Sequence, residues 1–140
     1  MKIVLAVDGS PYTKRMLAYI AAHDELVAAD NEFVALNVTP EVPPHAARHL
    51  PRDVLQQYYV DEGEKVLKPV REFAQMQGWP WRERHAVGRP GETLAEIVAA
   101  EKPDLLVMGS HGHGSFTSAL LGSVAARLLS QTQVPVLLIR

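Results

Sequence analysis

The sequence has 140 residues, of which 47% are hydrophobic and 21% are charged, and this length and composition favour one domain over residues 1–140 with its own core. Its 14 basic and 16 acidic residues give a formal net charge of −2 with no long run of either sign, so we expect no nucleic-acid surface and no membrane-binding surface. The chain has no cysteine, which excludes disulfides and thiol chemistry, and no apolar stretch nears the roughly 20 residues of a membrane span, so we expect a cytoplasmic protein.

Short β-branched runs alternate with helical patterns along the whole chain. Strands are expected at 3–7, 33–38, 81–87, 105–108 and 134–139, and a helical pattern follows each of the first four. Ser10 and Pro11 are typical of a cap and a first helical residue, so the first helix is expected to begin there. This βα alternation predicts an α/β fold, in which helices cover both faces of an open parallel sheet.

A proline-rich connection, 42–51, precedes a long amphipathic segment. The residues expected on its buried face recur at helical spacing: Leu55, Tyr59, Val66, Val70 and Phe73. Gly63 and Pro69 interrupt this pattern, and a proline inside a helix removes one hydrogen bond. We therefore expect either a kink or two helices in this segment.

The apolar content of the strands predicts their order in the sheet. "IVLAV" and "LLVM" are continuous apolar runs, as expected of central strands buried on both faces. "WRERHAV" carries charges typical of an exposed edge. Pro135 also indicates an edge, yet "VPVLLIR" is too apolar to face water. We therefore expect a homodimer through Val136, Leu137, Leu138 and Ile139.

The stretch "MGSHGHGSFTSALLGS", residues 108–123, follows a central strand and contains no lysine or arginine. If the first and fourth strands are neighbours, this loop and "DGS" meet at the crevice where α/β sheets bind ligands. Glycines 109, 112 and 122 allow the main chain to approach phosphate oxygens, and Ser123 stands at a helix start. The loop therefore predicts a phosphate cradle, with a polar surface connection as the alternative.

The spacing of this loop, Gly-2x-Gly-9x-Gly-Ser, resembles the signature of the ATP-binding branch of the universal stress protein family. The resemblance extends to "VLAVDGSP", "VGRPGETL", "DLLVMGSHG" and "VPVLLI", and so covers the whole chain. It implies a flavodoxin-like or Rossmann-like sheet of five parallel strands in the order 3-2-1-4-5, related to the adenine nucleotide alpha hydrolase-like fold. It also implies a dimer, and ATP as ligand, with Mg²⁺ bound through the phosphates.

The resemblance also implies a role for each matching residue. Asp8 would contact the ribose or adenine with Val7 beside it, while Val38 and Met108 would line the adenine pocket. The phosphates would lie between one group made of Gly109, His111 and Gly112 and a second group made of Gly122, Ser123 and Val124. Related loops often have Lys or Arg where this chain has His113, so this histidine is the departure from the pattern.

Other interpretations of these residues remain open. Asp8 is also suited to closing a turn before Ser10. His111 and His113 resemble part of a metal site, but no third ligand is evident, so we expect no metal site in the protein. His45, His49 and His85 are expected on the surface. No Walker lysine and no paired catalytic base are present, so a nucleotide-responsive regulator is expected, with a slow ATP hydrolase, a nucleotidyl transferase or a nucleotide-free dimeric module as alternatives.

Overall fold

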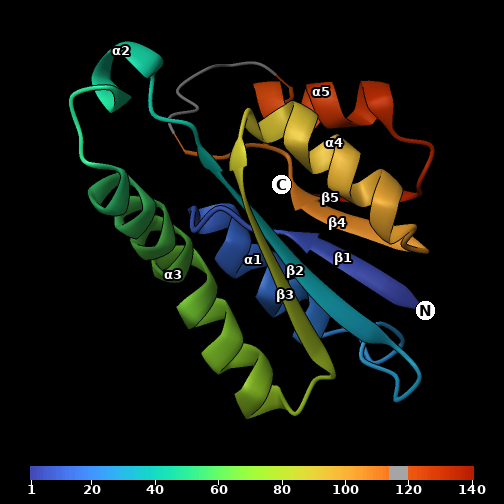
Figure 1. Cartoon of the computed structure of the whole chain (residues 1–140). Helices are drawn as coiled ribbons and strands as arrows, with labels where there is room; N and C mark the ends of the chain where they lie inside the picture. Colours follow the sequence, from blue (N-terminus) through green and yellow to red (C-terminus); the bar gives the residue numbers. More distant parts are fainter. Residues whose placement is uncertain (114–119) are drawn as a thin grey trace.

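The computed structural model describes residues 1–113 and 120–140, and its centre is a five-stranded, all-parallel sheet (Figure 1). The strands are β1 (Lys2–Ala6), β2 (Glu32–Pro40), β3 (Trp81–Gly88), β4 (Leu105–Gly109) and β5 (Val136–Ile139). Their order is β3-β2-β1-β4-β5. The expected α/β class and strand order are therefore confirmed.

Helices cover both faces of the sheet, as expected (Figure 1). They are α1 (Pro11–Ala21), α2 (Pro44–Ala47), α3 (Arg52–Gln77), α4 (Pro90–Glu101) and α5 (Ser123–Gln131). Successive side chains of a strand point to opposite faces. Accordingly, Leu5 of β1 packs in a core with α1 and α3, and Val4 packs in a second core with α4 and α5. Both faces of β1 and β4 are apolar, so these two strands contribute side chains to both cores.

The two edges of the sheet are occupied by β3 and β5, as their sequences predict. In β3, the side chains of Arg82 and Arg84 pair with Glu101 of α4. The last strand begins two residues later than expected. Val134 N–H donates to the Thr132 hydroxyl at 3.2 Å, and Pro135 has no N–H to give to a ladder. β5 therefore begins at Val136.

The long amphipathic segment is one continuous helix, α3, so the two-helix expectation is wrong. Pro69 lies on its exposed side, while Leu67, Val70 and Ala74 are buried against the sheet. That packing compensates for the single hydrogen bond lost at the proline. No helix in the described part of the chain has the length and apolar character that crossing a membrane requires.

Gly63 does not interrupt α3; it allows the helix to pack closely against the His85 side chain of β3. A Cβ on Gly63 would lie 2.8 Å from Nε2 of His85 on β3. The same ring nitrogen is 2.7 Å from the Thr39 hydroxyl of β2. Burial lowers the pKa of His85, with a smaller opposing contribution from Glu64. The imidazole is therefore a packed link between α3 and the sheet, although part of it faces solvent.

Candidate functional site

The residues expected at the site line a single cavity of about 880 Å³ at the carboxyl end of the sheet. The ends of β1, β2 and β4 and the start of α5 supply them: Val7, Asp8, Val38, Met108, Gly109, His111, Gly112, His113, Gly122, Ser123 and Val124. The connections from β1 and β4 leave toward opposite faces, because α1 and α5 lie in different cores. A crevice at this topological switch point is where open α/β sheets bind ligands.

Asp8 closes the turn between β1 and α1, as one interpretation of the sequence predicts. Its Oδ1 accepts a hydrogen bond from Ser10 N–H at 2.9 Å and another from the Thr13 hydroxyl at 3.2 Å. Gly9 has a φ of +76°, a conformation that a side chain would strain. The second carboxylate oxygen of Asp8 faces Gly112, where a Cβ would clash with it. The turn and the glycine loop are therefore fitted directly against each other.

The glycines of the loop permit close approach between chain segments. A Cβ on Gly109 would lie 2.6 Å from Cβ of Tyr12, and one on Gly122 would lie 3.2 Å from Cα of His111. Gly122 N–H donates to the Ser110 carbonyl at 2.7 Å, which brings the two ends of the loop together. Residues 114–119 of the expected cradle lie outside the described residues. The glycines thus have a packing role that is independent of any ligand.

The start of α5 forms part of the cavity wall. Gly122 is the cap residue and Ser123 is the first helical residue, and both line the cavity. The first N–H groups of a helix have no partners within it, and the helix dipole adds partial positive charge there. No acidic residue lies in the first turn of α5. This end of the cavity is therefore suited to an anion.

His113 connects the glycine loop to the β1–α1 turn. Its Nε2 lies 2.6 Å from the carbonyl oxygen of Asp8, and this nitrogen donates because a carbonyl only accepts. The ring of His111 lies 5.7 Å from the ring of Tyr12 on α1. In residues 1–113 and 120–140, no group of three or more histidine and carboxylate side chains is arranged to hold a metal ion. Both histidines line the cavity.

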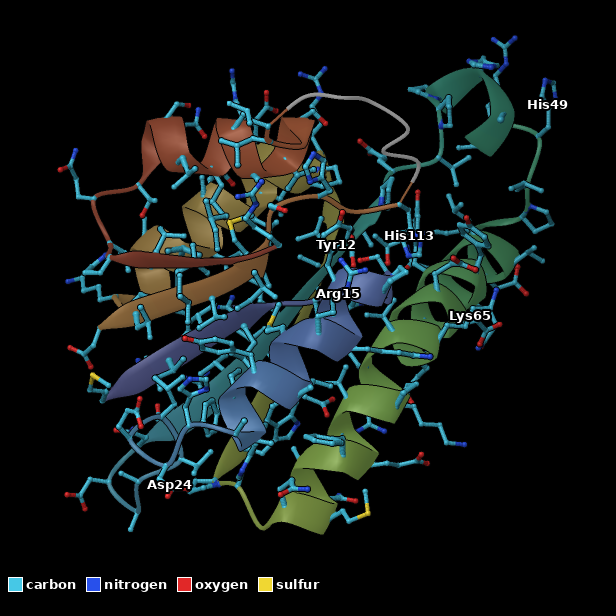
Figure 2. All side chains as sticks on the ribbon, turned by 180° about the vertical axis from the view of Figure 1, so that it is seen from behind. Tyr12, Arg15, Asp24, His49, Lys65 and His113 are labelled. Atoms are coloured by element: carbon cyan, nitrogen blue, oxygen red, sulfur yellow. The ribbon has the colours of Figure 1, made fainter. Side chains whose placement is uncertain are left out.

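Sequence reasoning missed the wall that α3 provides. Lys65 and Glu62 line the cavity and form an ion pair at 2.7 Å, and the hydrogen bond that Lys65 donates to Glu62 raises the pKa of Lys65. Figure 2 shows Tyr12 and His113 near the start of α1, with Lys65 on α3 beside them. The long amphipathic pattern of α3 gave no signal that its exposed side would reach the glycine loop.

Asn37 is a second lining residue that the sequence analysis did not single out. It is 4% exposed, and its Nδ2 donates to the Val7 carbonyl at 2.9 Å. Its Oδ1 is buried and has no hydrogen-bond partner among the described residues. A buried acceptor without a donor costs free energy. A polar side chain inside the apolar run of β2 was the available signal.

Comparisons with known proteins agree on one family. A universal stress protein of Thermus aquaticus is 31% identical over 139 residues, which cover 99% of this chain and 97% of that protein. The solved structure of the hypothetical protein MJ0577 has a TM-score of 0.83 at 23% identity and covers 99% of this chain and 94% of its own.

Two further solved structures of this fold contain adenine nucleotides. The Arabidopsis thaliana protein At3g01520 has AMP bound; it has a TM-score of 0.71 at 19% identity, and the match covers 99% of this chain and 90% of that protein's chain. The Archaeoglobus fulgidus universal stress protein is in complex with dAMP; it has a TM-score of 0.70 at 19% identity, and the match covers 100% of this chain and 98% of that protein's chain.

A sequence model of the Universal stress protein family matches residues 1–140. The chain therefore belongs to the universal stress protein family.

Proposed function

We propose that this protein binds ATP in the cavity at the carboxyl end of the sheet and acts in the cytoplasm as a nucleotide-responsive regulator. The observation that carries the proposal is the convergence of the expected ligand residues from β1, β2, β4 and α5 on one cavity. Its volume of about 880 Å³ lies in the usual range for small-molecule sites. The AMP and dAMP in structures of the same fold support an adenine nucleotide as the ligand class.

The inner part of the cavity fits an adenine ring. Val38 and Met108 are 9% and 4% exposed and offer an apolar surface on which a flat base can pack. Asn37 lies beside this surface, where its Nδ2 donates to the Val7 carbonyl and links the end of β2 to the residue that follows β1.

The outer part of the cavity fits phosphate groups. Gly109 and Gly112 present main chain without side chains, and the start of α5 supplies N–H donors. Residues 108–123 contain no charged side chain, so neutralising charge must come from elsewhere. Lys65 on α3 lines the same cavity, and Mg²⁺ carried by the phosphates supplies the rest. Asp8 and Glu62 also line the cavity, which makes this Mg²⁺ more important for a triphosphate than for a monophosphate.

The test compares two substitutions of Ser123 that differ in charge and little in size. An aspartate at the first residue of α5 interacts favourably with the helix dipole, so the helix should stay folded, but its negative charge repels a phosphate bound there. We expect Ser123→Asp to weaken ATP binding at least about tenfold and AMP binding less, since AMP carries fewer charges. Ser123→Asn, the neutral control, should stay close to wild type. Calorimetric titration of the folded variants with MgATP and AMP measures both affinities.

The possible outcomes separate the parts of the proposal. If wild-type protein binds neither ATP nor AMP, and no nucleotide is released from the purified protein on denaturation, the proposed function is wrong. If ATP binds equally well to wild type and Ser123→Asp, the start of α5 does not hold the phosphates. Retention of the wild-type circular dichroism spectrum by both variants excludes unfolding as the cause of weaker binding.

We also propose that two copies of the protein associate through β5. The strand is at the edge of the sheet, and Val136, Leu137 and Leu138 are only partly buried within the single chain. Burying the remaining exposed part of each side chain against a second copy is favourable by less than the roughly 1.5 to 3 kcal/mol of full burial, before the costs of association. The dimer is a proposal separate from nucleotide binding, and the two are tested independently.

A further inference from the structure

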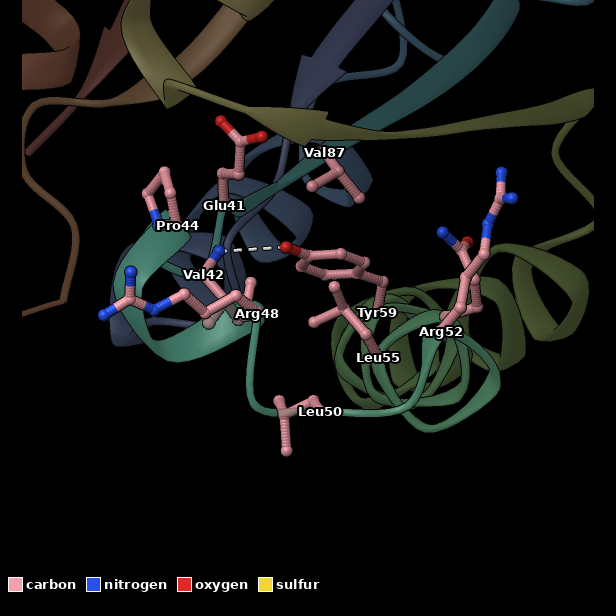
Figure 3. Close-up of a pocket in the computed structure, with 11 residues that line it drawn as sticks. Glu41, Val42, Pro44, Arg48, Leu50, Arg52, Leu55, Tyr59 and Val87 are labelled. Atoms are coloured by element: carbon pink, nitrogen blue, oxygen red, sulfur yellow. Dashed lines mark hydrogen bonds between the residues drawn. The ribbon is translucent and has the colours of Figure 1, made fainter.

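A second cavity, of about 720 Å³, lies between α2 and the first turns of α3 (Figure 3). It is lined by Glu41, Val42, Pro44, Ala47, Arg48, Leu50, Arg52, Leu55, Gln56, Tyr59 and Val87. None of these residues lines the candidate nucleotide cavity. The family resemblance assigned no role to this part of the chain, so the second cavity requires its own explanation.

The floor of the second cavity is apolar, and a hydrogen bond holds its central residue, Tyr59, in place. Tyr59 is 8% exposed, and its hydroxyl accepts a hydrogen bond from Val42 N–H at 2.9 Å (Figure 3). Leu55 and Val87 continue the apolar surface beside its ring. Leu50 and Val87 are 43% and 38% exposed, which is unfavourable for large apolar side chains in water. The cavity therefore offers apolar surface that a ligand could cover.

The segment that closes one side of the cavity is stiff. Pro43 caps α2, Pro44 is its first residue, and Pro51 caps α3, and each proline ring fixes one backbone angle. No residue of α2 is buried, so the segment bounds the hollow without filling it. A preformed hollow costs little ordering free energy when a ligand enters.

The rim of the cavity is positively charged on a protein whose net charge is −2. Between Val42 and Arg52 the sequence contains two arginines, two histidines and no acidic residue. Arg48 and Arg52 both line the cavity and are exposed, and they lie on opposite sides of Tyr59 (Figure 3). Glu41 is the acidic residue in the lining. The lining thus combines an apolar floor with a net positive rim.

We propose that this cavity binds a free medium-chain carboxylate, with its alkyl chain over Tyr59 and Leu55 and its carboxylate at the rim. The alkyl chain covers the exposed apolar side chains, and the guanidinium group at either end of the cavity, that of Arg48 or that of Arg52, can provide charge-assisted hydrogen bonds to the head group. The cavity volume is that of a small-molecule site. A short hollow fits such a ligand better than a peptide helix, which needs an extended groove.

The test titrates ¹⁵N-labelled full-length protein with sodium decanoate below its micelle concentration. We expect the largest amide shifts at Val42, Ala47 and Val87, since all three line the cavity. Decanol, which has the same chain without the charge, should bind about tenfold more weakly, and decyltrimethylammonium should not bind measurably. Arg48→Gln and Arg52→Gln should each weaken decanoate binding several-fold, and together about tenfold or more.

Two further variants separate the cavity from general charge effects. Ala47→Phe places a ring in the hollow and should abolish binding, while the exposed position of α2 leaves the fold intact. Lys14→Gln removes one positive charge from α1, outside the cavity, and should leave decanoate affinity unchanged. Equal loss of affinity in Lys14→Gln and Arg48→Gln would show nonspecific charge attraction and overturn the proposal.

Other results would also overturn it. These are no shift with decanoate, shifts centred on the nucleotide cavity, and equal binding of decanol and decanoate. Binding to phosphatidylglycerol vesicles without binding of free decanoate would assign the surface to a membrane instead. Decanoate-independent self-association that shifts the same amides would assign it to a second copy of the chain.

Discussion

Replacing Glu101 with glutamine tests how the edge strand β3 is held to the rest of the fold. Glu101 is 8% exposed at the end of α4. Its carboxylate accepts hydrogen bonds from Arg82 at 2.9 and 3.1 Å and from Arg84 at 2.9 Å, and it pairs with Lys2 of β1 at 3.5 Å. A glutamine keeps the shape of the side chain but removes the negative charge that these cations share.

The structure sets the expected magnitude and its pH dependence. Hydrogen bonds from Arg82, the largest cause, lower the pKa of Glu101 from 4.5 to about 2. Such a shift corresponds to about 3 kcal/mol at most. Arg82 and Arg84 are 46% and 42% exposed, so solvent screening should reduce this to about 1 to 2 kcal/mol. Because the folded-state pKa is lowered, this stability is present above pH 4.5 and is lost as pH falls toward 2.

The assay is urea unfolding of wild type and Glu101→Gln between pH 7 and pH 2, followed by circular dichroism. The variant should be less stable by about 1 to 2 kcal/mol at pH 7, and the difference should shrink between pH 4.5 and 2. Glu96→Gln, at an exposed position of the same helix, is the control and should differ little from wild type at any pH. A stability difference that stays constant across this pH range would refute the electrostatic explanation and point to altered packing.

Three further changes test other features. Gly63→Ala should lower the unfolding free energy by about 1 to 3 kcal/mol, because its Cβ would lie 2.8 Å from the His85 ring. In a protein that also carries His85→Ala, the same change should be nearly neutral, and an equal cost with and without His85 would contradict the clash. His113→Arg should strengthen MgATP binding about three- to tenfold by calorimetry and AMP binding less; unchanged ATP affinity would show that this position does not face the phosphates. Leu138→Lys should shift sedimentation from dimer to monomer while keeping the circular dichroism spectrum, and a wild-type monomer at high micromolar concentration would rule out the dimer.

The arrangement of the sheet could be predicted because burial constrains a strand on both faces. "IVLAV" and "LLVM" have no polar side chain to place toward water, so they had to be central, and the charges of "WRERHAV" had to be at an edge. The crevice between β1 and β4 then followed from topology. The cavity-lining positions of Asp8, Gly112 and Ser123 were predictable for the same reason, since strand ends and helix starts meet there.

Contacts made across the fold were not predictable from local pattern. Gly63 is typical of a helix breaker when only the sequence is considered. No neighbouring residue indicates that the His85 ring will lie against it. Lys65 reads as a solvated residue of an amphipathic helix, yet the position of α3 brings it to the wall of the cavity. The second cavity depends on how the connection at 42–51 turns back over Tyr59, and that path is set by tertiary packing.

The contrast between the two edges of the sheet limits how the protein can assemble. On β3, arginine side chains are engaged with Glu101 and Glu83 is engaged with Arg71, and charged edge strands resist addition of another strand. On β5 the side chains are those of valine, leucine and isoleucine. If copies join by the same edge on each, that edge is used up in a closed pair. A charged opposite edge would then oppose extension of such pairs into a continuous sheet, which two apolar edges would favour.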